Sequence, residues 1–383
     1  MFRIDRQLIK DFDWIMLAAV LLIAAMGLVN LYSATYASGS VGNLIFLRQL
    51  FFFLAGISFI IIIHLFDYRL LLKWNYPLYA VIVGLLLAAL LMGDSIAGTQ
   101  RWINFGFFRL QPSEPAKLML VISLASYYYR KDTGGGFTFK DMLVPIGLTG
   151  VLFLLVLKQP DLGTALMFVG IFGSMILFVK LRWSTIGIIF GLGATIIPIG
   201  WMFFLKPYQR LRIETFLNPE SDPTNSGYHI LQSKIAVGSG LKFGKGYLKG
   251  TQGHLHFLPE RHTDFAFSVW AEEWGFAGSL FFLAVYFFMI LWGVNVCIAS
   301  RDKFGVLLAF GIVSLIFWQA IINLLMVMGF LPVVGIPLPL FSYGGSSLMT
   351  TLIGIGLLMN IRMRKNQVSK LEPREYMSIS DIV

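Results

Sequence analysis

The stretch WIMLAAVLLIAAMGLVNLYSA, residues 14–34, holds no charged residue. A helix that crosses the hydrocarbon core of a bilayer needs about 20 consecutive, predominantly apolar residues. The stretch therefore predicts a transmembrane helix. It is longer than the apolar core of a typical signal peptide, so we expect it to be retained in the mature chain.

Apolar runs of similar length recur along the chain of 383 residues, of which 57% are hydrophobic and only 13% charged. Soluble domains carry about 25% charged residues. We therefore predict an all-α polytopic membrane protein that forms a single domain over residues 1–383, with about ten transmembrane helices. The predicted spans are residues 14–34, 44–66, 74–92, 114–130, 141–157, 162–180, 184–205, 265–297, 304–329 and 345–362.

The orientation follows from the placement of Lys and Arg, which membrane proteins concentrate in short cytoplasmic loops. The short loops fit this bias when the N-terminus is cytoplasmic, and ten spans then place the polar tail, residues 363–383, on the same side. The bias also accounts for the net charge of +10, so we expect no nucleic-acid partner. The single cysteine, Cys297, rules out an intrachain disulfide.

A large extracytoplasmic loop, residues 206–264, is predicted between the seventh and eighth spans, and it carries eight Lys and Arg residues. Loops of about 60 residues follow the charge bias only weakly. Loops longer than about 15 residues are usually functional or disordered. An amphipathic helical pattern at residues 229–237 indicates that this loop is folded. The eighth span is long enough to tilt or to project beyond the bilayer.

The motif FLPERHTDFAF, residues 257–267, places Asp264 where this loop meets the eighth span. Partial burial would raise the pKa of its carboxyl, and Arg261 and His262 would lower it. A carboxylate in this position could act as a general base. The alternative is that Asp264 caps the helix, a position that Asp favours.

The motif RLQPSEPAKLML, residues 109–120, opens the fourth span with two opposite charges three residues apart, on one helix face. Together with GTQRWINFG, residues 98–106, it suggests an anion site in which Arg and Lys hold phosphates. Interfacial anchoring by cations and Trp is the alternative. The candidate binding residues here are Glu114, Lys117, Arg101, Arg109, Trp102 and Gln111.

Two further motifs stand at the outer ends of predicted spans. Asp161 in LKQPDLGTAL, residues 157–166, either caps the sixth span or belongs to the site. The prolines and glycines of GIPLPLFSYGGSSL, residues 335–348, predict a broken or re-entrant segment. This segment either packs against the bundle or offers backbone N–H groups to an anion. Its candidate binding residues are Ser342, Gly344, Gly345 and Ser346.

Carboxylates, cations and a Gly-rich turn above an apolar bundle suit an amphiphilic substrate with an anionic head and a lipid tail. The sequence shows no zinc-ligand spacing, phosphate-binding loop or dinucleotide fingerprint in a plausible structural context. A metal site formed by His254, His256 and His262 is a weaker alternative to the site for an amphiphilic substrate. Among cofactors, only a divalent cation, Mg²⁺ or Mn²⁺, is left open. Glu272 and Glu273, inside the eighth span, are expected to be functional or paired because buried carboxylates are costly.

The chain resembles the SEDS family (shape, elongation, division and sporulation), particularly its rod-shape branch. The resemblance covers nearly the whole chain and rests on KDFDW, GTQRWINFGFFRLQPSEPAK, QPDLGTAL, NPESDPTNSGYHILQSKIAVGSG, GKGYLKGTQ, FLPERHTDFAF and PLPLFSYGGSS.

This resemblance implies a ten-span peptidoglycan glycosyltransferase of the bacterial inner membrane that polymerises lipid II and extends the growing glycan chain. It implies Asp264 as the essential residue and general base, and it gives functional weight to Glu114, Lys117 and Asp161. The implied partners are a class B penicillin-binding protein and the elongation machinery. Arg101, Arg109 and Arg210 are our physical candidates for neutralising the pyrophosphate, independent of the family.

Two other functions compete with the transferase. A lipid II flippase should carry charged groups near the bilayer midplane. Here the charges gather at the outer ends of the spans, although Glu272 and Glu273 soften that contrast. A scaffold that only recruits a penicillin-binding protein would not account for the carboxylates and cations gathered beside an apolar bundle.

Overall fold

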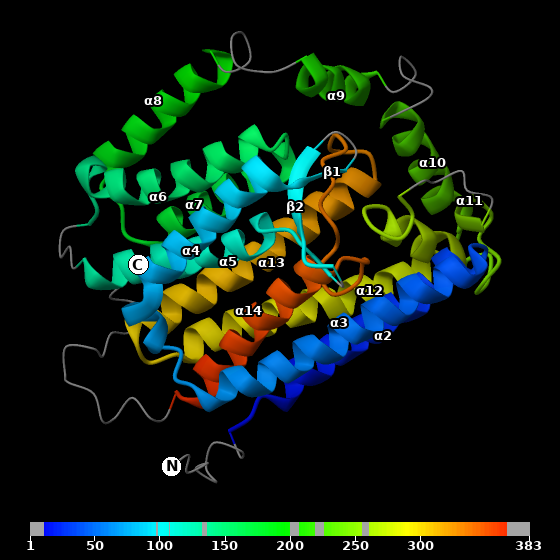
Figure 1. Ribbon diagram of the computed structural model, residues 1–383, viewed down its shortest axis with the longest axis horizontal. Helices are drawn as coiled ribbons and strands as arrows, with labels where there is room; N and C mark the ends of the chain where they lie inside the picture. Colours follow the sequence, from blue (N-terminus) through cyan, green and yellow to red (C-terminus); the bar gives the residue numbers. More distant parts are fainter. Residues whose placement is uncertain are drawn as a thin grey trace.

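The computed structural model describes residues 11–96, 99–106, 108–131, 136–199, 207–218, 226–254 and 260–365. Helices overlap all ten predicted spans and confirm the mostly helical fold (Figure 1). These helices are α2 (Trp14–Tyr36), α3 (Gly39–Leu65), α4 (Leu70–Met92), α5 (Ser113–Arg130), α6 (Phe139–Lys158), α7 (Leu162–Phe178), α8 (Trp183–Ile199), α12 (Ala266–Ala299), α13 (Lys303–Val327) and α14 (Gly345–Met363).

Within the described residues, seven of these helices are long and apolar enough to cross a membrane. They are α2, α3, α4, α6, α12, α13 and α14, so the protein is a multi-pass membrane protein. The remaining three are shorter or more polar: α7 and α8 have 17 residues each, and α5 carries three charged residues in 18. That these three also cross the bilayer stays a prediction.

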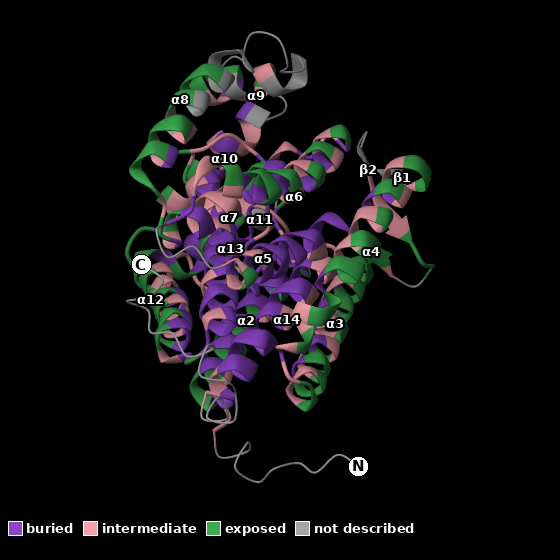
Figure 2. Ribbon diagram, turned by 90° about the vertical axis from the view of Figure 1, so that its left-hand side faces the viewer, coloured by how far each residue is buried: buried purple, intermediate pink, exposed green. Residues whose placement is uncertain are grey.

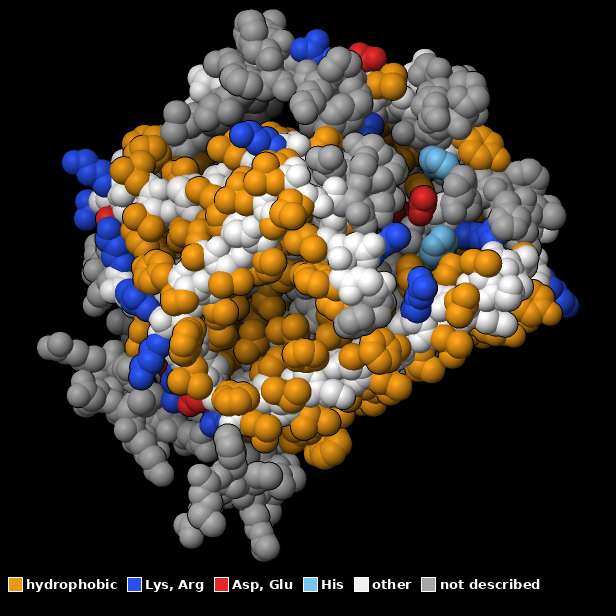
Figure 3. All heavy atoms as spheres, viewed as in Figure 1, with side chains coloured by type: hydrophobic (Ala, Val, Ile, Leu, Met, Phe, Trp, Pro, Cys, Tyr) orange, Lys and Arg blue, Asp and Glu red, His pale blue; other side chains and the backbone are white. Residues whose placement is uncertain are grey.

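The charged helix α5 lies at the centre of the bundle, where α4, α6, α7, α13 and α14 surround it. Nearly all of its side chains are buried, as are most of those on α13 and α14 (Figure 2). Exposed apolar side chains cover the outer faces instead, for example Phe51 on α3, Leu91 on α4 and Phe287 on α12 (Figure 3). Protein therefore surrounds Glu114 and Lys117 of α5, which reduces the cost of placing these charges in lipid.

A small antiparallel sheet, which the sequence analysis did not anticipate, fills the connection between α4 and α5. Its strands are β1 (Asp94–Ile96), β2 (Thr99–Asn104) and β3 (Arg109–Leu110), in the order β1-β2-β3. Trp102 stands opposite Asp94 and Asn104 opposite Arg109. The strands are too short to show a clear alternation of apolar and polar residues, the pattern that reveals strands in a sequence. The sheet carries Arg101 and Trp102 to one end of the bundle.

The predicted extracytoplasmic loop contains three described helices: α9 (Pro207–Leu217), α10 (Ser226–Ser239) and α11 (Thr251–His254). The helical pattern predicted at residues 229–237 falls within α10. This helix packs on α12 and α13. The Ser233 hydroxyl donates to Val327 O (2.6 Å) and lies 2.8 Å from the Ser268 hydroxyl. Helix α10 is therefore folded against the bundle, and α9 contacts α10.

Helix α12 is broken at Gly275, where φ is 64° and ψ is −161°. Residues 240–246, which we call the clasp loop, pair with the backbone on both sides of this break. Phe276 N donates to Leu241 O (2.8 Å), and Lys245 N donates to Glu272 O (3.0 Å). A Cβ at Gly275 would lie 2.2 Å from Gly244 N, so only glycine fits. The part of α12 after the break, residues 276–299, is about 36 Å long against an apolar core of about 30 Å. That this span tilts or projects beyond the bilayer stays a prediction.

The polar tail predicted at residues 363–383 begins where α14 ends, at Met363. Residues 366–383 lie outside the described residues.

Candidate functional site

Asp264 lies in the turn that leads into α12, at the end of the bundle that also carries the sheet (Figure 1). The N-cap of α12 is Phe265, and no side chain caps this helix. The alternative in which Asp264 is a helix cap is therefore wrong. The side chain is half-buried, and its carboxylate accepts no hydrogen bond from the described part of the chain. Its oxygens are free to take a proton from a ligand.

The surroundings of Asp264 hold its pKa near neutrality. Burial is the main cause that raises the pKa of the Asp264 carboxyl to about 7, and the negative charge of Glu260 acts in the same direction. Arg101 and Arg212 lower the pKa, and Asp161 raises it. A general base works best when its pKa lies close to the operating pH. Asp264 meets this condition, which an ordinary surface aspartate does not.

Asp161 fixes one of the cations that act on Asp264. Its Oδ1 accepts a hydrogen bond from Thr164 N (3.1 Å), so Asp161 caps α7. This confirms one of the two interpretations proposed for Asp161. Its Oδ2 accepts Gln111 Nε2 (3.3 Å) and lies 3.3 Å from Arg101 Nη1. The Arg101 side chain stays 27% exposed. The carboxylate therefore orients a cation that remains accessible to an anion.

Glu114 and Lys117 form an ion pair at 2.9 Å near the start of α5. Glu114 is only 4% exposed and Lys117 only 1%. Interfacial anchoring, which requires a charge that reaches water, is therefore the wrong interpretation for this pair. Glu114 N donates to Gln111 O (3.0 Å), so the pair lies directly beneath the residue that contacts Asp161. That the pair binds substrate stays a prediction.

The Gly-rich segment before α14 is tied to both neighbouring elements. Ser346 Oγ accepts Gln111 N (3.0 Å), which connects α14 to the strand that carries Arg109. Gly344 N donates to Gln49 Oε1 (3.3 Å), so this N–H already has a partner. A Cβ at Gly345 would lie 2.7 Å from the Phe52 ring. Ser342 Oγ accepts a hydrogen bond from Leu338 N (3.0 Å). All these contacts support the interpretation in which the segment packs against the bundle.

Glu272 is paired with Lys245, which is one of the two outcomes expected for these residues, and Glu273 is hydrogen-bonded to Ser33. Glu272 is 0% exposed and accepts Lys245 Nζ (2.6 Å) and Thr251 N (2.8 Å). Glu273 accepts the hydroxyl of Ser33. Glu272 therefore holds residues 245–251 against α12, and Glu273 connects α12 to α2.

Three residues near Asp264 were not singled out from the sequence. Glu260 lies in the same turn and could have been chosen, because it belongs to the same motif. Arg212 acts on Asp264 from α9 and donates to Val333 O (3.1 Å), whereas the cation selected from the sequence, Arg210, is not among the charges that shift Asp264. Asn323 donates to Asp264 O (2.8 Å) from α13, a contact that no local pattern reveals.

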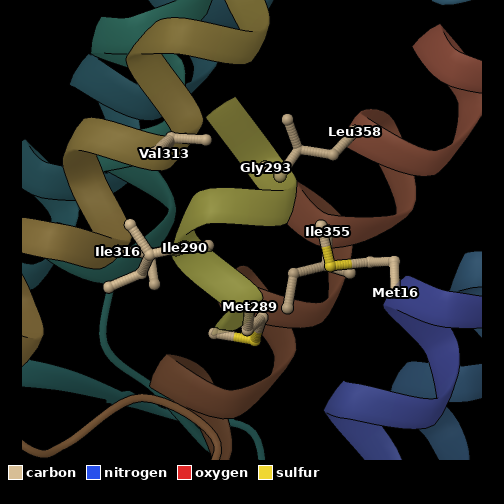
Figure 4. A pocket seen from close by; sticks show the side chains of 8 residues that line it. All are labelled: Met16, Met289, Ile290, Gly293, Val313, Ile316, Ile355 and Leu358. Atoms are coloured by element: carbon tan, nitrogen blue, oxygen red, sulfur yellow. The ribbon is translucent and has the colours of Figure 1, made fainter. Parts of the chain in front are cut away.

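Elsewhere the described structure shows no metal-binding cluster, and the pocket in its interior is apolar. No three His, Cys, Asp or Glu residues of the described part gather closely enough to hold a metal ion. The histidine alternative included His256, which lies outside the described residues. The pocket in Figure 4, between α2, α12, α13 and α14, is lined only by apolar side chains and Gly293. It lies about seven turns along α12 from Asp264 and offers no group for chemistry.

The fold and the site together define a polytopic membrane protein with a half-buried carboxylate, of raised pKa, at one end of a helical bundle. Comparison with known proteins gives the same answer. The family described as Cell cycle protein, which groups FtsW, RodA and SpoVE, matches residues 13–367. The peptidoglycan glycosyltransferase MrdB of Escherichia coli K12 is 43% identical over 298 residues, which is 78% of this chain and 80% of that protein. The peptidoglycan glycosyltransferase RodA of Treponema pallidum is 32% identical over 93% of this chain and 99% of its own.

Solved structures are similar over almost the whole length. A chain of a peptidoglycan synthase complex, solved to explain how polymerization and crosslinking are coordinated, has a TM-score of 0.79 and 32% identity, and the match covers 93% of this chain and 99% of that one. The rod shape determining protein RodA of Thermus thermophilus has a TM-score of 0.68 and 30% identity, over 92% and 97% of the two chains. The chain therefore belongs to the FtsW/RodA/SpoVE family, and it is a glycosyltransferase of the RodA type.

Proposed function

We propose that this protein polymerises lipid II into β-1,4 glycan strands for cell-wall elongation, with Asp264 as the general base. The observation that carries the proposal is the half-buried carboxylate of Asp264, which accepts no hydrogen bond from the described residues and whose pKa burial raises to about 7. The peptidoglycan glycosyltransferases among the relatives supply the reaction class.

In the proposed reaction, Asp264 takes the proton from the 4-hydroxyl of the acceptor's terminal GlcNAc. The acceptor oxygen forms a bond to the anomeric carbon of the donor sugar, and the bond from that carbon to the pyrophosphate oxygen breaks. Undecaprenyl pyrophosphate leaves with the electron pair, and this single displacement converts an α-linked donor into a β linkage. General-base catalysis of this kind contributes about 10²–10⁴-fold.

The charge that develops on the leaving pyrophosphate requires cations nearby. Arg101 is partly exposed and held by Asp161, and Arg109 is exposed on β3. Arg212 adds a third positive charge from α9. We assign pyrophosphate neutralisation to these residues. The described residues offer no cluster for a metal ion, so a divalent cation, Mg²⁺ or Mn²⁺, would be held mainly by the pyrophosphate itself.

The proposed location is the bacterial inner membrane, with both termini cytoplasmic and Asp264 on the outer face. Lys and Arg form a row at the end of the bundle opposite the site (Figure 3), as the positive-inside bias requires. A cysteine placed at Ser239, at the end of α10, in a Cys297→Ser background should react with an impermeant reagent added to intact spheroplasts. Reaction only after lysis would reverse the proposed orientation.

The proposed partner is a class B penicillin-binding protein within the elongation machinery. The support is the similarity to a chain of a peptidoglycan synthase complex, in which polymerization is coordinated with crosslinking. Cross-linking supplied by the partner would join the strands that this chain makes.

The deciding experiment is polymerisation of purified lipid II by the purified protein in detergent micelles, alone and with the partner. Micelles have no two leaflets, so a flippase gives no product in this assay. Long glycan products from the wild type, absent with Asp264→Asn, support the transferase. A folded wild type that makes no glycan with or without the partner contradicts it and favours a scaffold or a flippase.

A further inference from the structure

The turn that carries Asp264 is held through its backbone carbonyls by three different elements. Two carbonyls of the turn and that of the first residue of α12 accept hydrogen bonds from the segment before α14, from α13 and from α2. The three bonds are Tyr343 N to His262 O (2.9 Å), Asn323 Nδ2 to Asp264 O (2.8 Å) and Asn30 Nδ2 to Ala266 O (2.9 Å).

Asn323 makes a second contact that the other two donors do not. Its Nδ2 also donates to Ile336 O (2.7 Å), in the segment that passes beside the Asp264 carboxylate. That segment lies close, because a Cβ built on Gly335 would stand 3.6 Å from Asp264 Oδ2. One amide nitrogen, 0% exposed on α13, therefore ties the main chain of Asp264 to the backbone beside its own carboxylate.

The chemistry of the position favours an amide. Two carbonyl oxygens converge on a single side-chain atom, and only a group with two N–H bonds can satisfy both. The Oδ1 of Asn323 is buried and has no hydrogen-bond partner in the described part of the chain. An unpaired buried acceptor is unfavourable. The two donated bonds, and not the amide as a whole, therefore account for asparagine at this position.

We propose that Asn323 is a positioning residue that holds Asp264 in register with the acceptor hydroxyl. This inference rests on the proposed function, in which Asp264 is the base. The charged groups that face Asp264 are Glu260 on its own turn, Arg101 on β2, Asp161 before α7 and Arg212 on α9. When the Asp264 turn is released, its carboxylate moves toward water and away from the substrate, while these charges stay in place.

Two consequences separate this role from a purely structural one. A displacement of about 1 Å at a catalytic group can reduce the rate about 100-fold. The value of kcat should therefore fall, while KM for lipid II should stay nearly constant because the binding cations are unaffected. Greater contact with water lowers the pKa of a buried carboxyl. The acid limb of the kcat–pH profile should therefore move to lower pH.

Gln319 supplies a matched control one turn earlier on α13. It is 1% exposed, and its Nε2 donates to Pro337 O (3.3 Å) and to Ser347 Oγ (2.9 Å). It therefore holds the same segment as Asn323 but does not contact Asp264. Gln319→Leu and Asn323→Leu each remove one buried amide of α13 and differ in whether Asp264 is released.

The experiment measures lipid II polymerisation by wild type, Asn323→Leu and Gln319→Leu, matched for folded protein, from about pH 5 to pH 9. We expect Asn323→Leu to lower kcat about 10–100-fold, with KM within about threefold and the acid limb moved to lower pH. Gln319→Leu should keep kcat within about threefold, with an unmoved limb. Asn323→Gln, which keeps two N–H donors, should recover part of the activity. If Asn323→Leu does not fold, Asn323→Ser, with one donor, replaces it under the same criteria.

The inference is overturned if Asn323→Leu keeps wild-type kcat, if its kcat falls without a shift of the acid limb, or if Gln319→Leu shows the same loss and the same shift. These outcomes are distinct from failure of the proposed function. A wild type that makes no glycan contradicts the function itself. An active wild type, an inactive Asp264→Asn and an unaffected Asn323→Leu overturn only the positioning role.

Discussion

Asp264 and Asp302 both stand just before a long apolar helix, at opposite ends of the bundle. Asp302 is the N-cap of α13: its Oδ1 accepts Gly305 N (2.8 Å), and its Oδ2 accepts the Tyr68 hydroxyl and lies 3.7 Å from Arg69 Nη2. It is 3% exposed. Asp264 is half-buried, does not cap α12 and accepts no hydrogen bond from the described residues. Similar sequence positions thus produce a fully hydrogen-bonded carboxylate at one end and, at the other, a carboxylate that accepts no hydrogen bond from the described residues.

The difference shows how a carboxylate can serve stability or chemistry. Asp13 follows the same pattern as Asp302, because it caps α2 by accepting Met16 N (3.1 Å) and also accepts Trp292 Nε1 (3.0 Å). Oxygens that are engaged in this way stabilise the fold but cannot accept a substrate proton. The oxygens of Asp264 accept no hydrogen bond from the described residues, and the residue is held instead through its backbone carbonyl.

The largest effect should come from Asp264→Asn. This change keeps the size of the side chain and removes its ability to accept a proton, so polymerisation should fall about 10²–10⁴-fold. Folded yield should not fall, because the carboxylate makes no hydrogen bond to the described chain. Lipid II turnover by protein matched for folded amount checks this. A loss of turnover smaller than about threefold would remove Asp264 as the base.

The next largest effect should come from breaking the buried Glu114–Lys117 pair of α5. These variants test whether charged residues at the Asp264 end of the bundle can also serve stability. Removing one member of a buried ion pair costs about 3–5 kcal/mol, because the other charge stays buried and unpaired. Glu114→Gln and Lys117→Met should each lower the thermal midpoint strongly, and the double variant should lose less than the sum of the two. Thermal unfolding in detergent measures this. Additive losses would show that the two residues act independently.

Asp302→Ala should have the reverse profile of Asp264→Asn. Loss of the cap costs about 1 kcal/mol, and the unsatisfied partners raise the cost to about 2–3 kcal/mol. The thermal midpoint should fall, and turnover per folded molecule should stay within about threefold of wild type. If turnover per folded molecule falls as far as in Asp264→Asn, the proposed division between the two ends is wrong.

The pH profile should give the smallest but most specific signal. The pKa of Asp264 is raised to about 7, and only the ionised form is a base. The value of kcat should therefore decrease about tenfold per pH unit below 7. Glu260→Gln removes a negative charge that raises this pKa, so the acid limb should move to lower pH. An unmoved limb would show that Glu260 does not act on the base.

The same raised pKa predicts a small change in stability with the opposite sense to that of a paired aspartate. Between about pH 4 and 7, folded Asp264 keeps a proton that the unfolded chain has lost, so stability decreases as pH rises through this window and levels off above it. Asp264→Asn should remove this dependence, which thermal unfolding across the same pH range would show.

Much of the site could be placed from the sequence because its residues lie at predicted helix ends. Asp264, Asp161 and Gln111 were chosen from motifs at such ends and Arg101 from the loop before the fourth span, and the structure brings them to one end of the bundle. The role of Arg210 stays a prediction. Arg212 lies two residues later on α9 and lowers the pKa of Asp264, and only tertiary neighbours distinguish these two arginines. Asn323 was missed because a polar residue inside an apolar run has no local signature of its partner.

The sequence by itself determined the membrane class, the location of the helices and the position of Asp264 before α12, because apolar runs and helix-end residues are local properties. Only the tertiary structure decided which carboxylates are free. It paired Glu114 with Lys117 and Glu272 with Lys245, and it left Asp264 without a hydrogen-bond partner among the described residues. It also broke α12 at Gly275, where the clasp loop replaces the missing helical bonds. Each of these outcomes depends on contacts between segments far apart in the chain, and hydropathy and spacing carry no information about such contacts.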